Sequence, residues 1–139
     1  MNASNLATLV VVTFALLLGV RHFWPAGPLP VYQAVSVAVL AVAFCLFAVA
    51  RIQLGQSFSV AAKARHLVTT GLYSRIRNPI YVFGGLMIAA FLVYIGRPLY
   101  LLAFVVLIPV QIVRARTESR VLEETFGEEY RVYKARTWF

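Results

Sequence analysis

Four long apolar stretches occupy most of this 139-residue chain and leave it few ways to fold. They cover residues 6–20, 31–50, 80–95 and 99–113, and the chain as a whole is 61% hydrophobic. A soluble protein of this size has too little interior to bury that much apolar surface. A membrane-spanning helix needs about 20 mostly apolar residues, which the stretches reach with their flanking residues. The sequence therefore predicts an all-α integral membrane protein, with about four transmembrane helices in a single domain, 1–139.

The connections between these stretches predict how the helices are arranged. Gly96-Arg97-Pro98 is a turn signal, so the third and fourth stretches should form an antiparallel hairpin. An even number of spans places segments 51–79 and 114–139 on the same side of the membrane. We expect the first segment to be an ordered loop with short helical turns. We expect the second to form two short amphipathic helices, interrupted at Gly127, that fold back over the membrane face.

Basic residues are concentrated in the same two segments. The net charge is +8, and only Arg21 and Arg97 fall in the other two connections. This asymmetry follows the positive-inside rule, so we expect a multi-pass protein whose two basic segments are cytoplasmic. Such charge indicates contact with anionic membrane lipids and not with nucleic acid. Arg51, Lys63 and Arg131 are expected to contact lipid headgroups.

The residue types exclude several kinds of active site. The chain has no aspartate, two histidines and one cysteine, Cys45. A Ser-His-Asp triad, an internal disulfide and a metal site are therefore not expected. The sequence also has no P-loop and no dinucleotide-binding glycine motif.

The two polar segments are instead equipped to hold reactants. They contain three guanidinium groups of interest (Arg65, Arg77 and Arg114), a carboxylate that stands apart from the paired glutamates (Glu118), and the aromatic rings of Tyr73, Tyr81 and Tyr130. Transfer of a methyl group from S-adenosylmethionine needs little more than positioning and desolvation. Arginines can hold carboxylates, a glutamate can bind an ammonium group, and aromatic rings attract a sulfonium.

The order of these motifs resembles the isoprenylcysteine carboxyl methyltransferase and phospholipid methyltransferase superfamily of integral membrane enzymes. The first half of the pattern is matched by Leu67-Val68-Thr69, Gly71, Tyr73 and Arg77-Asn78-Pro79-Ile80-Tyr81. After the predicted hairpin, the second half is matched by Arg114, Glu118, Leu122, Phe126-Gly127, Glu129-Tyr130, Tyr133 and Arg136. The resemblance covers somewhat more than half of the chain.

The resemblance implies an S-adenosylmethionine pocket on the cytosolic face that opens toward the bilayer for a lipophilic acceptor. It assigns cofactor contacts to Arg65, His66, Leu67, Val68, Gly71, Tyr73, Arg77, Asn78, Pro79, Ile80, Tyr81 and Glu118. Arg114 and Glu118 become the catalytic candidates, because Glu118 would hold the amino group of the donor and Arg114 would orient the acceptor. The implied activity is most like that of an isoprenylcysteine-type carboxyl O-methyltransferase.

Other interpretations of the same residues remain open. The acceptor could be a phospholipid amine, or the protein could be a non-catalytic binding or scaffold protein that keeps the fold. Arg65 stands at the histidine position of the pattern, with His66 displaced by one, and Ser119 stands at its second glutamate. Asn78 and Pro79 could simply begin a helix. Arg114 and Glu118 have the spacing of a structural ion pair, and the sequence specifies no oligomeric state.

Overall fold

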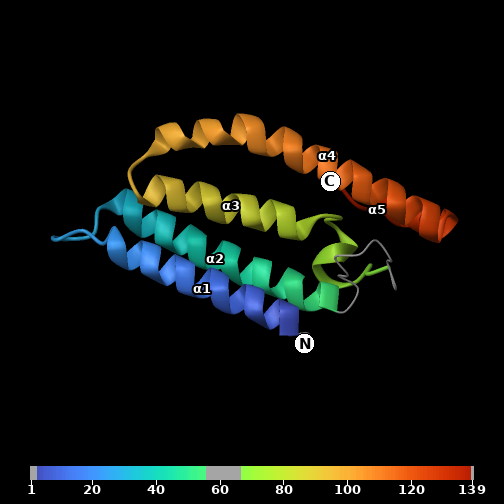
Figure 1. The fold of residues 1–139 in the computed structure, drawn as a ribbon, viewed down its shortest axis with the longest axis horizontal. Coiled ribbons are helices and arrows are strands. Elements are labelled where there is room, and N and C mark those ends of the chain that lie inside the picture. The colour runs from blue at the N-terminus through green and yellow to red at the C-terminus, as the bar shows by residue number, and fades with distance from the viewer. Residues whose placement is uncertain (1–2, 56–66, 139) are drawn as a thin grey trace.

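The structure of the chain is a computed structural model that describes residues 3–55 and 67–138. Helices account for most of it, in the order α1 (Ala3–His22), α2 (Val31–Leu54), α3 (Pro79–Tyr94), α4 (Phe104–Phe126) and α5 (Glu128–Arg136). Two 3-10 turns, η2 (Gly71–Ser74) and η3 (Pro98–Ala103), precede α3 and α4. The first four helices run up and down along one long axis (Figure 1).

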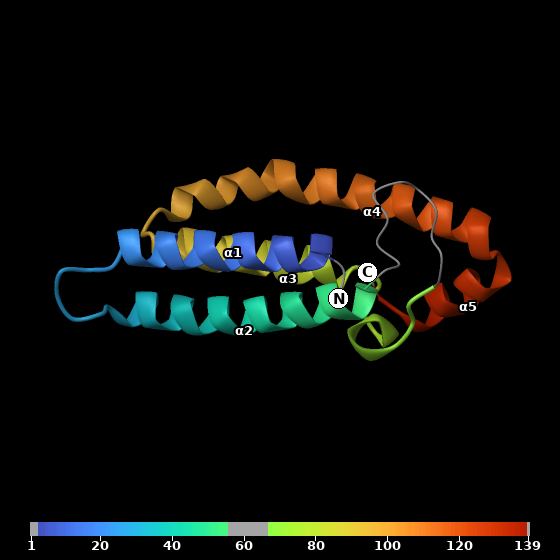
Figure 2. The ribbon, with the colours of Figure 1, turned by 60° about the horizontal axis from the view of Figure 1, so that its bottom comes forward.

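Three of these segments are long and apolar enough to cross a membrane, namely Asn5–His22, Val31–Leu54 and Leu99–Phe126. The helix α3 is also apolar but has 16 residues. That corresponds to about 24 Å of helix, against a hydrocarbon core of about 30 Å. It lies beside α2 along most of its length (Figure 1, Figure 2). The all-α membrane fold is therefore confirmed, with three helices of spanning length and a shorter apolar helix packed among them.

The core of the bundle lies between α2 and α3. Its buried cluster consists of Leu40, Ala43, Met87 and Ala90. Small side chains let helices approach closely in a membrane, where packing has to replace the hydrophobic effect. The helix α1 makes its approach at Gly19, where an added Cβ would lie 2.6 Å from the ring of Phe91. Any side chain at this position would have to displace the Phe91 ring.

Polar side chains near the two ends of the bundle hydrogen bond between helices. Arg51 is only 7% exposed and donates to Thr8 Oγ1 at 2.9 Å. At the opposite end, Gln33 Nε2 donates to the Tyr94 carbonyl at 3.0 Å. Such bonds satisfy groups that lipid cannot solvate. The expectation that Arg51 contacts headgroups is wrong, because the arginine is buried against α1; Lys63 lies outside the described residues.

The helix α4 corrects the expected layout of the second polar segment. It runs without a break from Phe104 through Arg114 to Phe126, so Arg114 does not begin a separate helix at the membrane surface. No glycine or proline stands between Pro109 and Gly127, and about half of the residues there are the good helix formers Arg, Glu, Gln, Leu and Ala. None of the described side chains of α4 is buried. Figure 2 shows α4 standing apart from α2 and continuing beyond the end of that helix.

The interruption expected at Gly127 is present, and it turns the chain back toward the bundle. Gly127 has a positive φ of 54°, which favours glycine, and α5 follows it directly. Beyond α5, the Trp138 N–H donates to the Arg75 carbonyl at 3.0 Å, and the Arg77 N–H donates to the Trp138 carbonyl at 3.4 Å. The end of the chain is thereby held against the segment that leads into α3.

Candidate functional site

Tyr81, Arg114 and Glu118 form a polar cluster where α3 begins and the polar half of α4 passes it. The Tyr81 hydroxyl donates to Glu118 Oε2 at 3.0 Å, and the Arg114 guanidinium carbon lies 5.8 Å from the centre of the Tyr81 ring. Residues four apart on a helix share a face, so both α4 side chains reach the same tyrosine. None of the ion pairs among the described residues joins Arg114 to Glu118. The two charges are therefore directed at Tyr81 and not at each other.

The start of α3 explains why Tyr81 is in position. Asn78 is the residue before the helix and Pro79 its first residue, as their order predicts. The Asn78 carbonyl accepts the Tyr81 N–H at 3.1 Å, whereas its side chain makes no capping hydrogen bond. Pro79 is buried and Ile80 half-buried. The motif thus begins a helix and, in doing so, presents Tyr81 to α4.

Tyr73 lies in η2, which is held against the end of α2. Gly71 has a positive φ of 62°, and any Cβ there would collide with the Gln53 side chain. Gln53 Oε1 accepts the Leu72 N–H at 2.9 Å, so the same side chain also anchors the turn. The local structure therefore favours glycine at position 71, independently of the cofactor contact predicted for it. Leu67 and Val68 precede the turn, half-buried.

The helix α5 connects this turn to α4. The Tyr133 hydroxyl donates to the Tyr73 carbonyl at 2.8 Å, and the Tyr130 hydroxyl donates to Ser119 Oγ at 2.8 Å. Both tyrosines are buried, and their rings lie 6.0 Å apart. Ser119, at the position of the second glutamate in the pattern, is thus an acceptor for Tyr130.

Burial keeps Tyr133 and Tyr73 neutral. It raises the pKa of Tyr133 from 10.0 to about 12, with a further contribution from Tyr130. Burial also raises the pKa of Tyr73 above its usual value, and the nearby Tyr133 and Glu118 act in the same direction. A neutral phenol keeps its O–H, so Tyr133 can donate to the Tyr73 carbonyl throughout the physiological pH range.

Arg77 and Asn78 line a cavity beside α4, on a different side of that helix from Arg114 and Glu118. It has a volume of about 630 Å³ and is lined by Arg77, Asn78, Ile112, Ala115, Arg116, Ser119, Arg120, Glu123 and Lys134. This lining includes neither Tyr81 nor Glu118. The structure thus places Tyr81, Glu118 and Arg114 in one cluster and Arg77 and Asn78 in the basic cavity. Leu67, Val68, Gly71 and Tyr73 lie in or before η2, and Arg65 and His66 lie outside the described residues.

Three further residues position the site: Gln53 and Tyr133, which the sequence did not identify as site residues, and Tyr130, which it gave only as one of several aromatic rings. Gln53 ends up beside Gly71 because α2 continues as far as Leu54. Tyr130 and Tyr133 are three residues apart, a spacing that places them on one face of α5 and was a usable signal. No local pattern identifies Gln53, because its partner lies 19 residues further along the chain.

Comparison with known proteins agrees with this architecture. A family model for phospholipid methyltransferases matches residues 31–129, well over half of the chain. No curated protein sequence matches the chain. The matched family lies within the superfamily of integral membrane methyltransferases that the two motifs resemble, so that resemblance is confirmed. The chain belongs to the phospholipid methyltransferase family, whose members are methyltransferases embedded in a membrane.

Proposed function

We propose that this protein transfers a methyl group from S-adenosylmethionine to a lipophilic acceptor. The observation that supports this most directly is the hydrogen bond between Tyr81 and Glu118 beside the Arg114 guanidinium. A carboxylate, an aromatic ring and a guanidinium therefore lie together at the point where α4 changes from apolar to polar residues. A donor with water-soluble groups and an acceptor with an apolar tail can meet at such a boundary.

The residues of this cluster fit the donor. Glu118 is exposed and receives a hydrogen bond on Oε2 only, so within the described residues Oε1 has no hydrogen-bond donor and can accept an ammonium group. The Tyr81 ring offers a π-face to a cation, as its contact with Arg114 illustrates. When bound, S-adenosylmethionine supplies a methyl group on a positively charged sulfur. Leu67, Val68 and Tyr73 are proposed to complete this side of the pocket.

The contribution of the protein is then mainly positioning. Tyr81 fixes the direction of the Glu118 carboxylate, and the start of α3 at Pro79 fixes Tyr81. Arg114 is free of ion pairs in the described part of the chain and can orient the polar end of an acceptor. Holding two reactants in line removes much of the entropic part of the barrier without any nucleophile from the protein.

The acceptor that the cluster suits best is a lipophilic carboxylate, as in an isoprenylcysteine-type carboxyl O-methyltransferase. A carboxylate arrives ionised, needs no base, and matches the fork of the Arg114 guanidinium. A phospholipid amine arrives as an ammonium that must first lose a proton. That proton would need a base, and the carboxylate of the cluster, Glu118, is already occupied: it accepts the Tyr81 hydrogen bond and is proposed to hold the donor.

Calorimetric titration of purified protein with S-adenosylmethionine and with its demethylated product tests the donor site. We expect both to bind, and Glu118→Gln to weaken binding by about tenfold or more, because a hydrogen bond to a charged group contributes about 1.5–3 kcal/mol. Glu124→Gln, an exposed glutamate on the same helix, is the matched control and should bind as the wild type does. Absence of binding at millimolar ligand would instead favour a non-catalytic scaffold.

Transfer of labelled methyl into a membrane and lipid extract tests the acceptor class. A base-labile methyl ester in the labelled product supports the carboxylate proposal. Label in a base-stable methylamine headgroup would overturn that choice and identify a phospholipid amine instead. Arg114→Gln should reduce transfer while leaving donor affinity nearly unchanged, because its assigned contact is with the acceptor.

We also propose that the site faces the cytoplasm, as the distribution of basic residues supports. A membrane-impermeant thiol reagent can test this in a Cys45→Ala background. In right-side-out vesicles we expect it to label Gly27→Cys and to leave Ala135→Cys unlabelled. Both residues are exposed, and the loop between α1 and α2 lies at the opposite end of the bundle from α5 (Figure 1). The reverse pattern would place the site on the other side of the membrane.

A further inference from the structure

The basic cavity beside α4 has an excess of positive charge that its own carboxylate does not neutralise. Arg77, Arg116 and Arg120 line it and take part in no ion pair within the described residues. Glu123 also lines the cavity, but Arg131 and Lys134 already engage its two oxygens, at 3.1 Å and 3.4 Å. The cavity therefore favours an anion and offers no unengaged carboxylate to an ammonium group.

Arg77 is held in the wall of this cavity with part of its guanidinium buried. Its Nε atom is buried and has no hydrogen-bond partner in the described part of the chain. A buried donor without an acceptor costs free energy, and an arginine donor most of all. A phosphate group accepts from guanidinium N–H groups in bidentate geometry, so one in the cavity could bind the terminal nitrogens of Arg77, Arg116 and Arg120.

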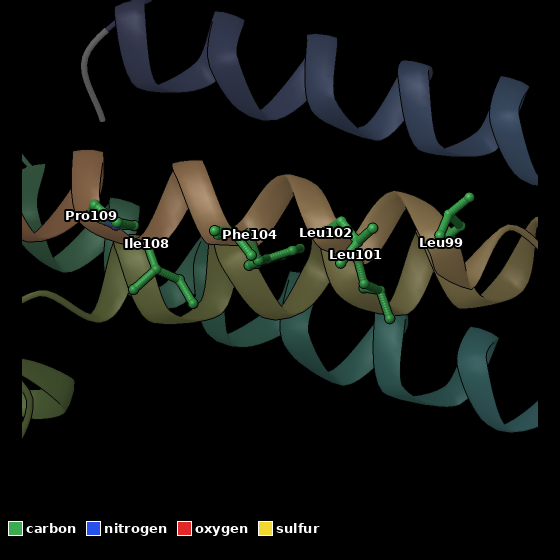
Figure 3. Close-up of a pocket in the computed structure, with 7 residues that line it drawn as sticks. Leu99, Leu101, Leu102, Phe104, Ile108 and Pro109 are labelled. Carbon is green, nitrogen blue, oxygen red and sulfur yellow. The ribbon is translucent and has the colours of Figure 1, made fainter.

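An apolar groove continues from the cavity along the same face of α4. It has a volume of about 600 Å³ and is lined by Leu99, Leu101, Leu102, Phe104, Val105, Ile108 and Pro109. Figure 3 shows these side chains following one another along η3 and the first turns of α4. Ile108 in the groove and Ile112 in the cavity are four residues apart, one turn of helix. The apolar groove and the basic cavity therefore follow one another along one face of α4.

This face is separate from the Tyr81–Glu118–Arg114 cluster. Residues advance around a helix by about 100° each, which places Arg116 and Arg120 roughly opposite Arg114 and Glu118 on α4. A molecule in the basic cavity would therefore not displace one held by Glu118. A binding site in the cavity would be additional to the one proposed for methyl transfer and would not depend on it.

We propose that the cavity and the groove together bind one anionic phospholipid. Its phosphate lies among Arg77, Arg116 and Arg120, and an acyl chain lies along the face of α4 from Ile112 toward Phe104. The net positive charge selects a headgroup such as phosphatidylglycerol over the zwitterionic phosphatidylcholine. The entirely apolar lining of the groove selects a lipid over free phosphate.

Native mass spectrometry of the detergent-purified protein can test this with phosphatidylglycerol and phosphatidylcholine of identical acyl chains. We expect one phosphatidylglycerol to bind preferentially. Arg116→Gln with Arg120→Gln should weaken that binding by about 25-fold, given a factor of about five for each basic side chain near an anionic lipid. Equal binding of the two lipids would overturn the proposal.

Matched controls separate a built site from general attraction to a basic protein. Arg75→Gln with Arg136→Gln removes the same charge from exposed side chains outside the cavity, and binding should stay within about twofold of the wild type. An equal loss in both double variants would contradict a defined site. Circular dichroism and thermal unfolding should show the same helical fold in the wild type and in both double variants.

The groove and the source of the phosphate have their own tests. Ile108→Trp fills the groove and should weaken phosphatidylglycerol binding severalfold, whereas Val106→Trp, an exposed position outside the groove lining, should not. Inorganic phosphate at millimolar concentration should displace little lipid. Efficient displacement by inorganic phosphate, or an unchanged affinity in Ile108→Trp, would overturn the lipid assignment.

Discussion

The Tyr133 hydroxyl donates a 2.8 Å hydrogen bond to the backbone carbonyl of Tyr73, and so joins the last helix to the turn that precedes α3. The bond spans 60 residues of sequence and is buried. It explains how a nine-residue helix with little apolar surface keeps a defined place in the structure. The bond holds the two segments that carry the sequence motifs together, the one before α3 and the one after α4. It lies outside the Tyr81–Glu118–Arg114 cluster.

Removal of this hydroxyl should destabilise the polar end of the bundle. Tyr133→Phe leaves the Tyr73 carbonyl buried without its donor, which costs about 1–3 kcal/mol. Thermal unfolding in detergent should therefore show a lower Tm. Tyr100→Phe is the control, because Tyr100 is 54% exposed and makes no side-chain hydrogen bond in the described structure. Equal Tm values for the two variants would show that the bond contributes nothing.

The same tyrosine predicts how stability changes in alkaline solution. The folded pKa of Tyr133 is about 12 against an ordinary value of 10.0, so the folded state holds this proton more tightly than the unfolded state. Its contribution is fully present below about pH 10 and is lost as the pH rises toward 12. The Tm should fall over that interval. The fall should be smaller in Tyr133→Phe, and an identical fall in both proteins would contradict this assignment.

The fold follows from local signals to a large extent. The apolar stretches, the turn at Gly96 and the interruption at Gly127 each depend on a few neighbouring residues. No comparable local signal ends α4 where its apolar residues stop. Residues 114–126 form helix well, and no glycine or proline separates them from the apolar half, so the helix simply continues. A change from apolar to polar residues marks a change of environment and does not by itself end a helix.

The candidate site could be predicted only in part. Tyr81 and Glu118 belong to motifs, and the structure places them in contact. Arg77 and Asn78 adjoin the same motif, yet they line a different cavity from Tyr81. The turn into α3 separates side chains that are close in sequence. Gln53 was missed because its role depends on the conformation of Gly71, which belongs to another element.

Gly71→Ala should be strongly destabilising because two costs act together. A residue with a side chain at φ of 62° costs about 1–2 kcal/mol, and the Cβ would also displace Gln53 from its hydrogen bond to Leu72. Gly96→Ala has a similar φ of 69°, and its Cβ would make only an ordinary contact, 3.6 Å from the Tyr32 hydroxyl oxygen, so it is the matched control for the first cost. We expect Gly71→Ala to lower the Tm more than Gly96→Ala does. The reverse order would mean that Gln53 moves aside without loss.

Gly19→Ala should weaken the packing of α1 against the rest of the bundle. The new methyl group would meet the Phe91 ring at 2.6 Å, and overpacking of this kind typically costs about 1–3 kcal/mol. Gly84→Ala is the matched control, since the nearest atom to its Cβ is 3.8 Å away, an ordinary contact. Comparison of the two Tm values checks the prediction. A Gly19→Ala protein as stable as Gly84→Ala would show that Phe91 has room to rotate.

The hydrogen bond between Tyr81 and Glu118 predicts that the two residues act together in binding the donor. If Tyr81 serves by orienting the carboxylate, Tyr81→Phe should weaken S-adenosylmethionine binding in the wild type and have much less effect once Glu118→Gln is present. A double-mutant cycle on the dissociation constants should give a coupling of about 1 kcal/mol, within the range for residues in direct contact. Tyr32→Phe, on the half-exposed surface of α2, should not couple to Glu118. Strictly additive effects of Tyr81→Phe and Glu118→Gln would mean that each residue contacts the donor independently, and that the hydrogen bond is not what holds the carboxylate in place.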